Sequence, residues 1–130
     1  MKREYIERYA RRYMPRDLWV KVAMALADVE SGFDENAVSP HGKSVGLWQQ
    51  RREFFAGYSP LPYYMRPCWW AQFGALKTFF VEHSGRPLVE VLQVYHYGHP
   101  VRGDRDGYVQ RVRDAFAALG YEWPGDNAVL

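Results

Sequence analysis

Glu30 is the residue of this sequence whose surroundings best suit acid–base chemistry. A carboxyl group on the apolar face of a helix leaves water when the helix packs, and this raises its pKa because the charged form is disfavoured. A carboxyl group with a raised pKa can act as a general acid near neutral pH. Glu30 ends such a face, whose apolar residues recur at three- and four-residue spacing: Trp19, Val22, Ala23, Leu26 and Val29.

The residues after Glu30 predict that its helix ends at once and opens onto a loop. Ser31 and Gly32 end the helix, and residues 34–45 are rich in Asn, Ser, Pro and Gly, which favour turns. Glu30 is therefore expected at a helix terminus that a substrate can reach. Within the loop, Ser39 could orient the Glu30 carboxyl group or a polar group of the substrate, and the role of an ordinary turn residue stays equally open.

Motifs around and after Glu30 resemble the signature of the lysozyme-like lytic transglycosylases. They span about residues 18–116, in the order that the family has. The fourth motif stands where the family carries Tyr-Asn-x-Gly, and the fifth resembles its Tyr-Val-x-x-Val element. In chain order they are Glu30-Ser31-Gly32-Phe33, Ala37-Val38-Ser39-Pro40 with Gly42, Gly46-Leu47-Trp48-Gln49, Tyr95-His96-Tyr97-Gly98, and Tyr108-Val109 with Val112.

Three positions depart from the family pattern. Lys43-Ser44 occupies a place that is usually one small residue, so the loop is one residue longer. Trp48 replaces the commoner Met, as in phage-borne relatives, and His96 replaces the usual Asn. None of these departures changes the acid.

The resemblance implies a mainly α fold, in which residues 1–130 form a single lysozyme-like domain of about six helices with a substrate groove. It implies no cofactor and no metal. Glu30 would be the catalytic residue, and Tyr108 would form a hydrogen bond near it. The residues expected to contact substrate are Ser39, Gln49, Tyr95, His96 and Tyr108, and those expected to shape the groove and its loop are Ser31, Gly46, Leu47, Trp48 and Gly98.

Two of the shaping residues also have purely structural interpretations. Gly46 allows close approach of the backbone to another group, but it would also serve in a simple turn. Trp48 would fit an ordinary hydrophobic core. Gln49 can both donate and accept hydrogen bonds, which favours a contact with substrate.

The resemblance also implies a mechanism with one carboxyl group acting on a peptidoglycan glycan strand. Glu30 would protonate the β-1,4 glycosidic oxygen after N-acetylmuramic acid, assisted by the sugar's own N-acetyl group. The resulting carboxylate would take a proton from the C6 hydroxyl group, which closes a 1,6-anhydro ring. Most glycosidases instead use two carboxyl groups. No second carboxyl group of this sequence has an apolar setting; the candidates are Asp34, Glu35, Glu53, Asp104 and Asp106.

Two other functions remain compatible with the sequence. One is a hydrolytic muramidase of the same fold, which would use water and a second carboxyl group such as Asp34. The other is a structural or glycan-binding module that keeps the fold without turnover, for which His96 and the longer loop are the arguments. The products separate them, because hydrolysis leaves a reducing sugar and transglycosylation an anhydro end.

The composition is that of one globular domain. The chain has 130 residues, of which 48% are hydrophobic and 25% charged, and this excludes a disordered protein. Aromatic residues make up 17%, which suits either a sugar-binding groove or an aromatic core. Seventeen basic residues against 15 acidic ones give a net charge of +2, too small for a dedicated nucleic-acid surface.

The sequence shows no route across a membrane. It has no long apolar run, and its first 13 residues carry charges throughout, so neither a membrane span nor a signal peptide is expected. A protein that acts at the cell wall or in the periplasm would then be delivered by a virion or another release route, with virion or envelope proteins as partners. The single Cys68 excludes an internal disulfide and is expected to be a buried thiol.

Apolar periodicity and Pro or Gly boundaries predict six helices. They are expected at residues 2–13, from Arg16-Asp17 to Ser31, and at 46–56, 68–84, 87–97 and about 106–119. Residues 57–67 are expected to form a Pro-interrupted connection, and residues 121–130 an irregular tail. His96 and His99 lie near Asp104 and Asp106, but this pattern is weak support for a metal site.

Overall fold

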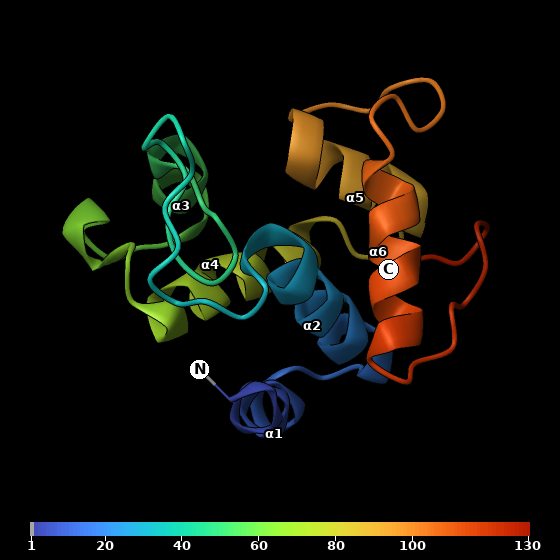
Figure 1. Ribbon diagram of the computed structural model, residues 1–130, viewed down its shortest axis with the longest axis horizontal. Helices are drawn as coiled ribbons and strands as arrows, with labels where there is room; N and C mark the ends of the chain where they lie inside the picture. The colour runs from blue at the N-terminus through green and yellow to red at the C-terminus, as the bar shows by residue number, and fades with distance from the viewer. Residues whose placement is uncertain (1) are drawn as a thin grey trace.

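The computed structural model describes residues 2–130 and is mainly α-helical (Figure 1). In this part of the chain, β-type pairing is limited to three isolated bridges. The mainly α prediction is therefore confirmed. The elements are α1 (Arg3–Tyr13), α2 (Asp17–Ser31), α3 (Arg52–Tyr58), the 3-10 helix η1 (Tyr63–Met65), α4 (Trp69–Glu82), α5 (Leu88–Tyr97) and α6 (Tyr108–Ala118).

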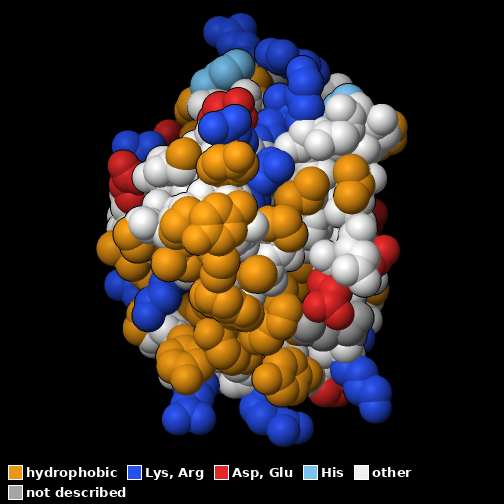
Figure 2. All heavy atoms as spheres, turned by 90° about the vertical axis from the view of Figure 1, so that its left-hand side faces the viewer, with side chains coloured by type: hydrophobic (Ala, Val, Ile, Leu, Met, Phe, Trp, Pro, Cys, Tyr) orange, Lys and Arg blue, Asp and Glu red, His pale blue; other side chains and the backbone are white. Residues whose placement is uncertain are grey.

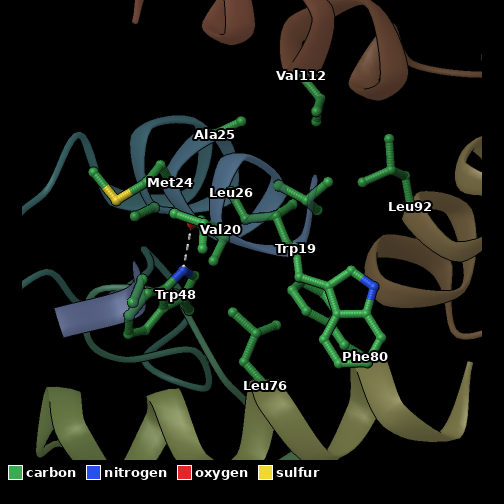
Figure 3. Close-up of a cluster of buried hydrophobic side chains, with 14 of the residues drawn as sticks. Trp19, Val20, Met24, Ala25, Leu26, Trp48, Leu76, Phe80, Leu92 and Val112 are labelled. Atoms are coloured by element: carbon green, nitrogen blue, oxygen red, sulfur yellow. Dashed lines mark hydrogen bonds between the residues drawn. The ribbon is translucent and has the colours of Figure 1, made fainter. Parts of the chain in front are cut away.

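Helix α2 lies at the centre of the hydrophobic core. Nearly every residue from Trp19 to Ala27 is buried, and a helix that is apolar on all sides belongs in a protein interior. It packs against α1 and α6. Figure 3 shows side chains from the other helices converging on it: Leu76 and Phe80 from α4, Leu92 from α5 and Val112 from α6. The core thus holds rigidly the helix that carries Glu30.

Trp48 anchors the loop after α2 to this core. Its side chain is fully buried, and its indole Nε1 donates a hydrogen bond of 2.8 Å to the carbonyl oxygen of Ala23 in α2 (Figure 3). Leu47 beside it is also fully buried. The core interpretation of Trp48 is therefore confirmed, and its hydrogen bond holds the loop against α2.

The helix expected at residues 46–56 is wrong in its first half. Gly46 has φ +83° and Gln49 has φ +48°, and both values lie outside the right-handed helical region. Residues 45–50 instead form a tight turn, closed by a hydrogen bond of 3.0 Å from the Gln50 N–H to the Val45 carbonyl oxygen. Helix α3 begins only at Arg52 and extends to Tyr58, so the connection expected at 57–67 starts later and contains η1.

The other five helices lie within two residues of their expected bounds. Helix α6 begins at Tyr108 because aspartates of the preceding loop accept hydrogen bonds from its first N–H groups. Asp104 accepts from Val109 and Gln110, each at 2.9 Å, and Asp106 accepts from Tyr108 at 3.2 Å. These are the N–H groups that a helix leaves without an internal partner.

The segment 121–130 has no helix, but it is tied to the core. Leu130 is fully buried, and its carbonyl oxygen accepts hydrogen bonds from Trp19 Nε1 at 2.8 Å and from Arg16 Nη1 at 3.1 Å. Its N–H donates to the Arg86 carbonyl oxygen. The tail therefore covers one end of α2 and α5.

One face of the molecule carries many exposed apolar side chains. Figure 2 shows a broad hydrophobic area on the side where α1, η1 and the start of α4 lie in Figure 1. Cys68, expected to be buried, is only half-buried beside this face. No helix within residues 2–130 is long and apolar enough to cross a membrane. The exposed aromatic residues of these elements are Tyr5, Tyr13, Tyr63, Tyr64 and Trp70.

Candidate active site

A groove of about 830 Å³ lies at the end of α2 where Glu30 is located. In Figure 1, the loop that follows α2 lies together with α3 on one side of this helix end, and α5 lies on the other side. The groove is lined by Glu30 from α2, by Ser39, His41, Ser44, Gln49, Gln50 and Arg51 from the loop, by Glu53, Phe54 and Tyr58 from α3, by Phe79 from α4, and by Val94, Tyr95, His96, Tyr97 and Gly98 at the end of α5.

Glu30 is the second-last residue of α2, and the helix end is closed as its sequence predicts. Gly32 adopts the left-handed conformation, with φ +61°, that commonly ends helices. The Ser31 hydroxyl group donates a hydrogen bond of 2.7 Å to the Leu47 carbonyl oxygen. Ser31 thus joins the helix end to the turn at residues 45–50.

The protein environment raises the pKa of Glu30 from 4.5 to about 7. Burial is the largest cause, since the side chain leaves water at the end of the apolar face. The Tyr108 hydroxyl group and the charge of Arg111 act in the opposite direction and lower the pKa. The net shift has the direction that the apolar stripe predicts. It places both protonation states of Glu30 within reach at neutral pH.

Tyr108 lies under the groove and faces Glu30. Only 1% of its surface is exposed, and its ring stacks on the His96 ring at a centroid distance of 3.9 Å with an interplanar angle of 2°. Its buried hydroxyl group forms no hydrogen bond of ordinary geometry with a described residue, but it interacts with the Glu30 carboxyl group, whose pKa it lowers. Tyr108 is thus placed to act on Glu30, and it has no surface left for sugar.

His96 lies at the rim of the groove and is held on two sides. One face of its ring covers Tyr108, and Nε2 lies 2.8 Å from Asp106 Oδ2. The hydroxyl group of Tyr97 donates to the other oxygen of Asp106. These hydrogen bonds hold the pKa of the Asp106 carboxyl group well below its usual range. The loop before α6 and the end of α5 are therefore joined at the groove.

Tyr95 combines a position in the groove with a structural hydrogen bond. Its hydroxyl group donates to the Trp48 carbonyl oxygen at 2.7 Å. Burial, followed by the nearby charge of Glu30, raises the pKa of Tyr95 well above 10.0. Tyr95 is thus neutral and joins α5 to the turn on the opposite side of the groove.

Gln49 and Ser39 also line the groove, but local hydrogen bonds engage part of their polar groups. Gln49 Nε2 donates to the carbonyl oxygens of Ala37 and Gly46, both at 3.0 Å. The Ser39 hydroxyl group lies 3.1 Å from His41 Nδ1 and accepts from the Ser44 N–H at 3.0 Å. These hydrogen bonds engage the Ser39 hydroxyl group and Gln49 Nε2, but not Gln49 Oε1. Ser39 therefore acts as a turn residue, as one of its two interpretations predicts.

Gly46 is required where the loop meets α4. A Cβ atom at this position would lie 2.3 Å from Nε2 of Gln72, and the φ of +83° also disfavours other residues. Gln72 is fully buried; it accepts from the Trp48 N–H at 3.0 Å and donates to the Val45 carbonyl oxygen at 2.8 Å. The close approach at Gly46 is therefore to Gln72, and Gly46 also serves in the turn at residues 45–50.

Gln72 is a supporting residue that the sequence interpretation missed. Its sequence signal was a single amide side chain within the apolar face of residues 68–84. A buried amide in such a face must find hydrogen-bond partners, which here are the backbone atoms of the turn. The groove residues of α3 and α4 were missed because apolar spacing does not distinguish a core residue from one at a groove; they are Phe54, Tyr58 and Phe79.

The other carboxyl groups differ in their access to the groove. Glu53 lines it and is exposed, whereas Asp34 and Glu35 are not among the lining residues. Asp104 and Asp106 are engaged at the start of α6. Within residues 2–130, no group of three or more His, Cys, Asp or Glu side chains is placed to hold one metal ion.

Comparison with protein families matches residues 4–58 to the transglycosylase SLT domain. This segment of the chain is similar to that family. The match extends from α1 to the end of α3 and includes Glu30, Ser39 and Gln49. The family comprises lytic transglycosylases that act on peptidoglycan, so the match confirms the resemblance, the lysozyme-like fold and the enzyme class.

The side of the groove formed by α5 lies outside the matched segment. Tyr95, His96 and Tyr108 come from α5 and α6, and the fold brings them to Glu30. No curated protein and no solved structure matches the chain. The roles of these residues therefore rest on their positions around the groove.

Proposed function

We propose that this SLT transglycosylase cleaves the β-1,4 bond between N-acetylmuramic acid and N-acetylglucosamine with Glu30 as its one general acid and base. The protonated carboxyl group gives its proton to the glycosidic oxygen as the bond to the anomeric carbon breaks. The sugar's own N-acetyl oxygen assists at that carbon. The Glu30 carboxylate then takes the proton of the C6 hydroxyl group, whose oxygen bonds to the anomeric carbon and closes the 1,6-anhydro ring.

The observation that carries this proposal is the pKa of about 7 for Glu30 at a helix end in the groove. A residue that is first acid and then base must exist in both protonation states near the working pH. The two groups that lower this pKa, Tyr108 and Arg111, stabilise the carboxylate that forms after the first step. The raised pKa supports the first step, and these two groups support the second.

The proposed roles of the other residues follow from their positions. Gln49 would offer Oε1 to a sugar hydroxyl or amide group, because its Nε2 is engaged by the loop. Tyr95 and His96 would present ring faces and edges to the sugars on the α5 side, and Ser39 a hydroxyl group on the loop side. Tyr108 would position Glu30 and adjust its pKa without touching sugar.

The products of the reaction test the proposal. Purified peptidoglycan is incubated with the protein, and the soluble fragments are weighed by mass spectrometry. Fragments that end in 1,6-anhydro-N-acetylmuramic acid, one water lighter than hydrolytic fragments, are expected. Full-mass reducing ends would contradict the proposal and indicate a muramidase, for which Glu53 is the second carboxyl group in the groove. Binding without products would indicate a glycan-binding module.

We also propose that the enzyme meets its substrate in the cell wall or periplasm and is carried there by a virion or released by another route. Trp48, which stands where the resembling family commonly has Met, is the sequence feature behind the virion route. The test compares virions that carry the wild-type protein with virions that carry Glu30→Gln. We expect lysis by the first and none by the second. Equal lysis by both kinds of particle would contradict this delivery.

A further inference from the structure

A second hollow adjoins the groove and is strongly basic. It has a volume of about 300 Å³ and is lined by Lys43, Arg51, Arg52, Glu53 and Arg66. Arg51 and Glu53 also line the groove, so the two hollows share a wall. We call these five residues the basic pocket. A ligand in the groove therefore has the basic pocket directly beside it.

The cations of the basic pocket are not neutralised by the protein. It contains four cations and one carboxyl group, and within residues 2–130 none of the four forms an ion pair. Elsewhere among the described residues, ion pairs of Lys and Arg side chains are limited to Arg11, Lys21 and Arg113. Figure 2 shows Lys and Arg side chains gathered in its upper part, above the hydrophobic area. Like charges around one hollow attract and concentrate anions.

Two of these cations are held in place before any ligand binds. Arg66 Nη1 donates to the carbonyl oxygens of Lys43 at 2.9 Å and Gln50 at 3.1 Å. The Nε atom of Arg66 is buried without a partner of its own among the described residues. The Arg52 guanidinium group lies 4.2 Å from the centre of the Tyr63 ring, a cation–π contact. Side chains that are already ordered lose less entropy on binding.

We propose that the basic pocket binds the carboxylate groups of the peptide stems on the glycan strand that lies in the groove. This inference rests on the proposed function. Every N-acetylmuramic acid of peptidoglycan can carry a peptide on its lactyl group, and that peptide carries carboxylates. A guanidinium group matches a carboxylate through two parallel hydrogen bonds. Because the basic pocket shares a wall with the groove, a stem on a bound strand reaches it without leaving the sugar.

The consequence is selectivity for strands that still carry peptides. The carbohydrate in the groove is the same in substituted and bare strands, so any difference between them arises from the stems. Exposed charges interact weakly and are screened by salt, with a Debye length of about 8 Å at 0.15 M. The preference for peptide-bearing strands is therefore expected at low ionic strength and is expected to fade as salt is added.

The test compares two substrates prepared from walls freed of phosphate polymers. One keeps its stems, and the other is stripped of them by an amidase. The variant Lys43→Gln with Arg52→Gln removes two exposed cations of the basic pocket and leaves Arg66, which has structural hydrogen bonds. The variant Arg3→Gln with Arg8→Gln removes two exposed cations from α1 and serves as the matched control.

The wild-type protein is expected to cleave the intact strands with a kcat/KM roughly fivefold higher than the bare strands at low salt. The Lys43/Arg52 variant is expected to lose this preference while it keeps its rate on bare strands. The control is expected to keep the preference. Circular dichroism checks that both variants are folded.

Equal cleavage of the two substrates by the wild-type protein would overturn the inference. So would a Lys43/Arg52 variant that slows equally on both substrates, because this would show a general effect on the groove. Inhibition by soluble poly(glycerol phosphate), with none by isolated stem peptide, would assign the basic pocket to phosphate instead. Failure of the proposed function can be distinguished from failure of this inference, because it would appear as an absence of anhydro ends in the products of both substrates.

Discussion

Glu30 and Asp106 are two carboxyl groups that meet Tyr108 from different sides and have opposite properties. Glu30 faces the Tyr108 hydroxyl group and has a pKa raised to about 7. Asp106 accepts a hydrogen bond from the Tyr108 backbone N–H and has a pKa held below its usual range. One carboxyl group can give a proton near neutral pH, and the other stays charged.

The difference has a simple physical origin. Burial dominates at Glu30, where the Tyr108 hydroxyl group and the charge of Arg111 only partly compensate for lost water. Asp106 remains in solvent and accepts hydrogen bonds from Tyr97 and His96, which stabilise its charge. Loss of water raises the pKa of a carboxyl group, which can then act as an acid near neutral pH. Hydrogen-bond donors around a solvent-exposed carboxyl group lower its pKa, so that it stays charged and serves a structural role. The chemical role of a carboxyl group thus depends on its surroundings.

Replacing Glu30 is expected to have the largest effect on activity. Glu30→Gln keeps the size and removes proton transfer, so lysis should fall about 10²- to 10⁴-fold. Turbidity loss of a peptidoglycan suspension measures the rate. Asp106→Asn is the matched change at the other carboxyl group, and a comparable loss there would contradict the distinction between them.

The stability of the protein should show the raised pKa of Glu30 directly. Its pKa is about 7 when folded and 4.5 without the protein environment, so folding takes up a proton between these values. The neutral form of Glu30 makes its full contribution to the free energy of unfolding below pH 4.5, and this contribution is lost as the pH rises through 7. Relative to Glu30→Gln, the wild type should lose up to about 3 kcal/mol between pH 4.5 and 8. Urea unfolding at both pH values measures this.

An unchanged difference between the two proteins across this pH range would show that Glu30 is not desolvated. The same property predicts that the rate of cleavage declines above about pH 7, because the carboxyl group then lacks its proton. A rate that keeps rising to pH 9 would contradict the general-acid role.

Removing the Tyr108 hydroxyl group should increase the difference between the pKa of Glu30 and that of Asp106. This group lowers the pKa of Glu30, so Tyr108→Phe should raise that pKa further and move the alkaline decline of the rate to higher pH. The rate at neutral pH is expected to fall about tenfold, the order expected when a hydroxyl group that stabilises the Glu30 carboxylate is lost. The ring stack on His96 remains in this variant. A pH profile identical to that of the wild type would contradict the proposed positioning role.

Asp106→Asn is expected to give the smallest effect. The variant keeps the shape but loses the charge that His96 and Tyr97 face, so the loop before α6 should loosen. We expect a lower melting temperature and a rate within about threefold of the wild type, since the acid itself is untouched. Thermal unfolding and the turbidity assay measure these two quantities. A pH profile displaced as in Tyr108→Phe would show instead that Asp106 acts on Glu30.

The helices that carry the site could be predicted because their signals are local. The apolar stripe that ends at Glu30, the stop at Gly32 and the Pro87 start of α5 each depend on residues within two or three turns. The direction of the Glu30 pKa followed from the same stripe. For these features the sequence alone was sufficient.

The turn at residues 45–50 could not be predicted in this way. Its sequence is compatible with a helix, and the deciding contacts come from Gln72 in α4, far along the chain. The left-handed backbone of Gln49 is likewise accompanied by hydrogen bonds from its side chain to Ala37 and Gly46 across the turn. Contacts at long sequence separation override local preference at such positions.

By itself, the sequence determined which carboxyl group lies at the end of an apolar helix face, which helix carries it and where that helix stops, since each depends on near neighbours. Only the tertiary structure decided that His96 stacks on Tyr108 and that Arg66 joins Lys43 and Arg51 around one hollow beside the groove. The physical reason is that desolvation along one helix follows the spacing of its own apolar residues, whereas a groove exists only where separate elements meet.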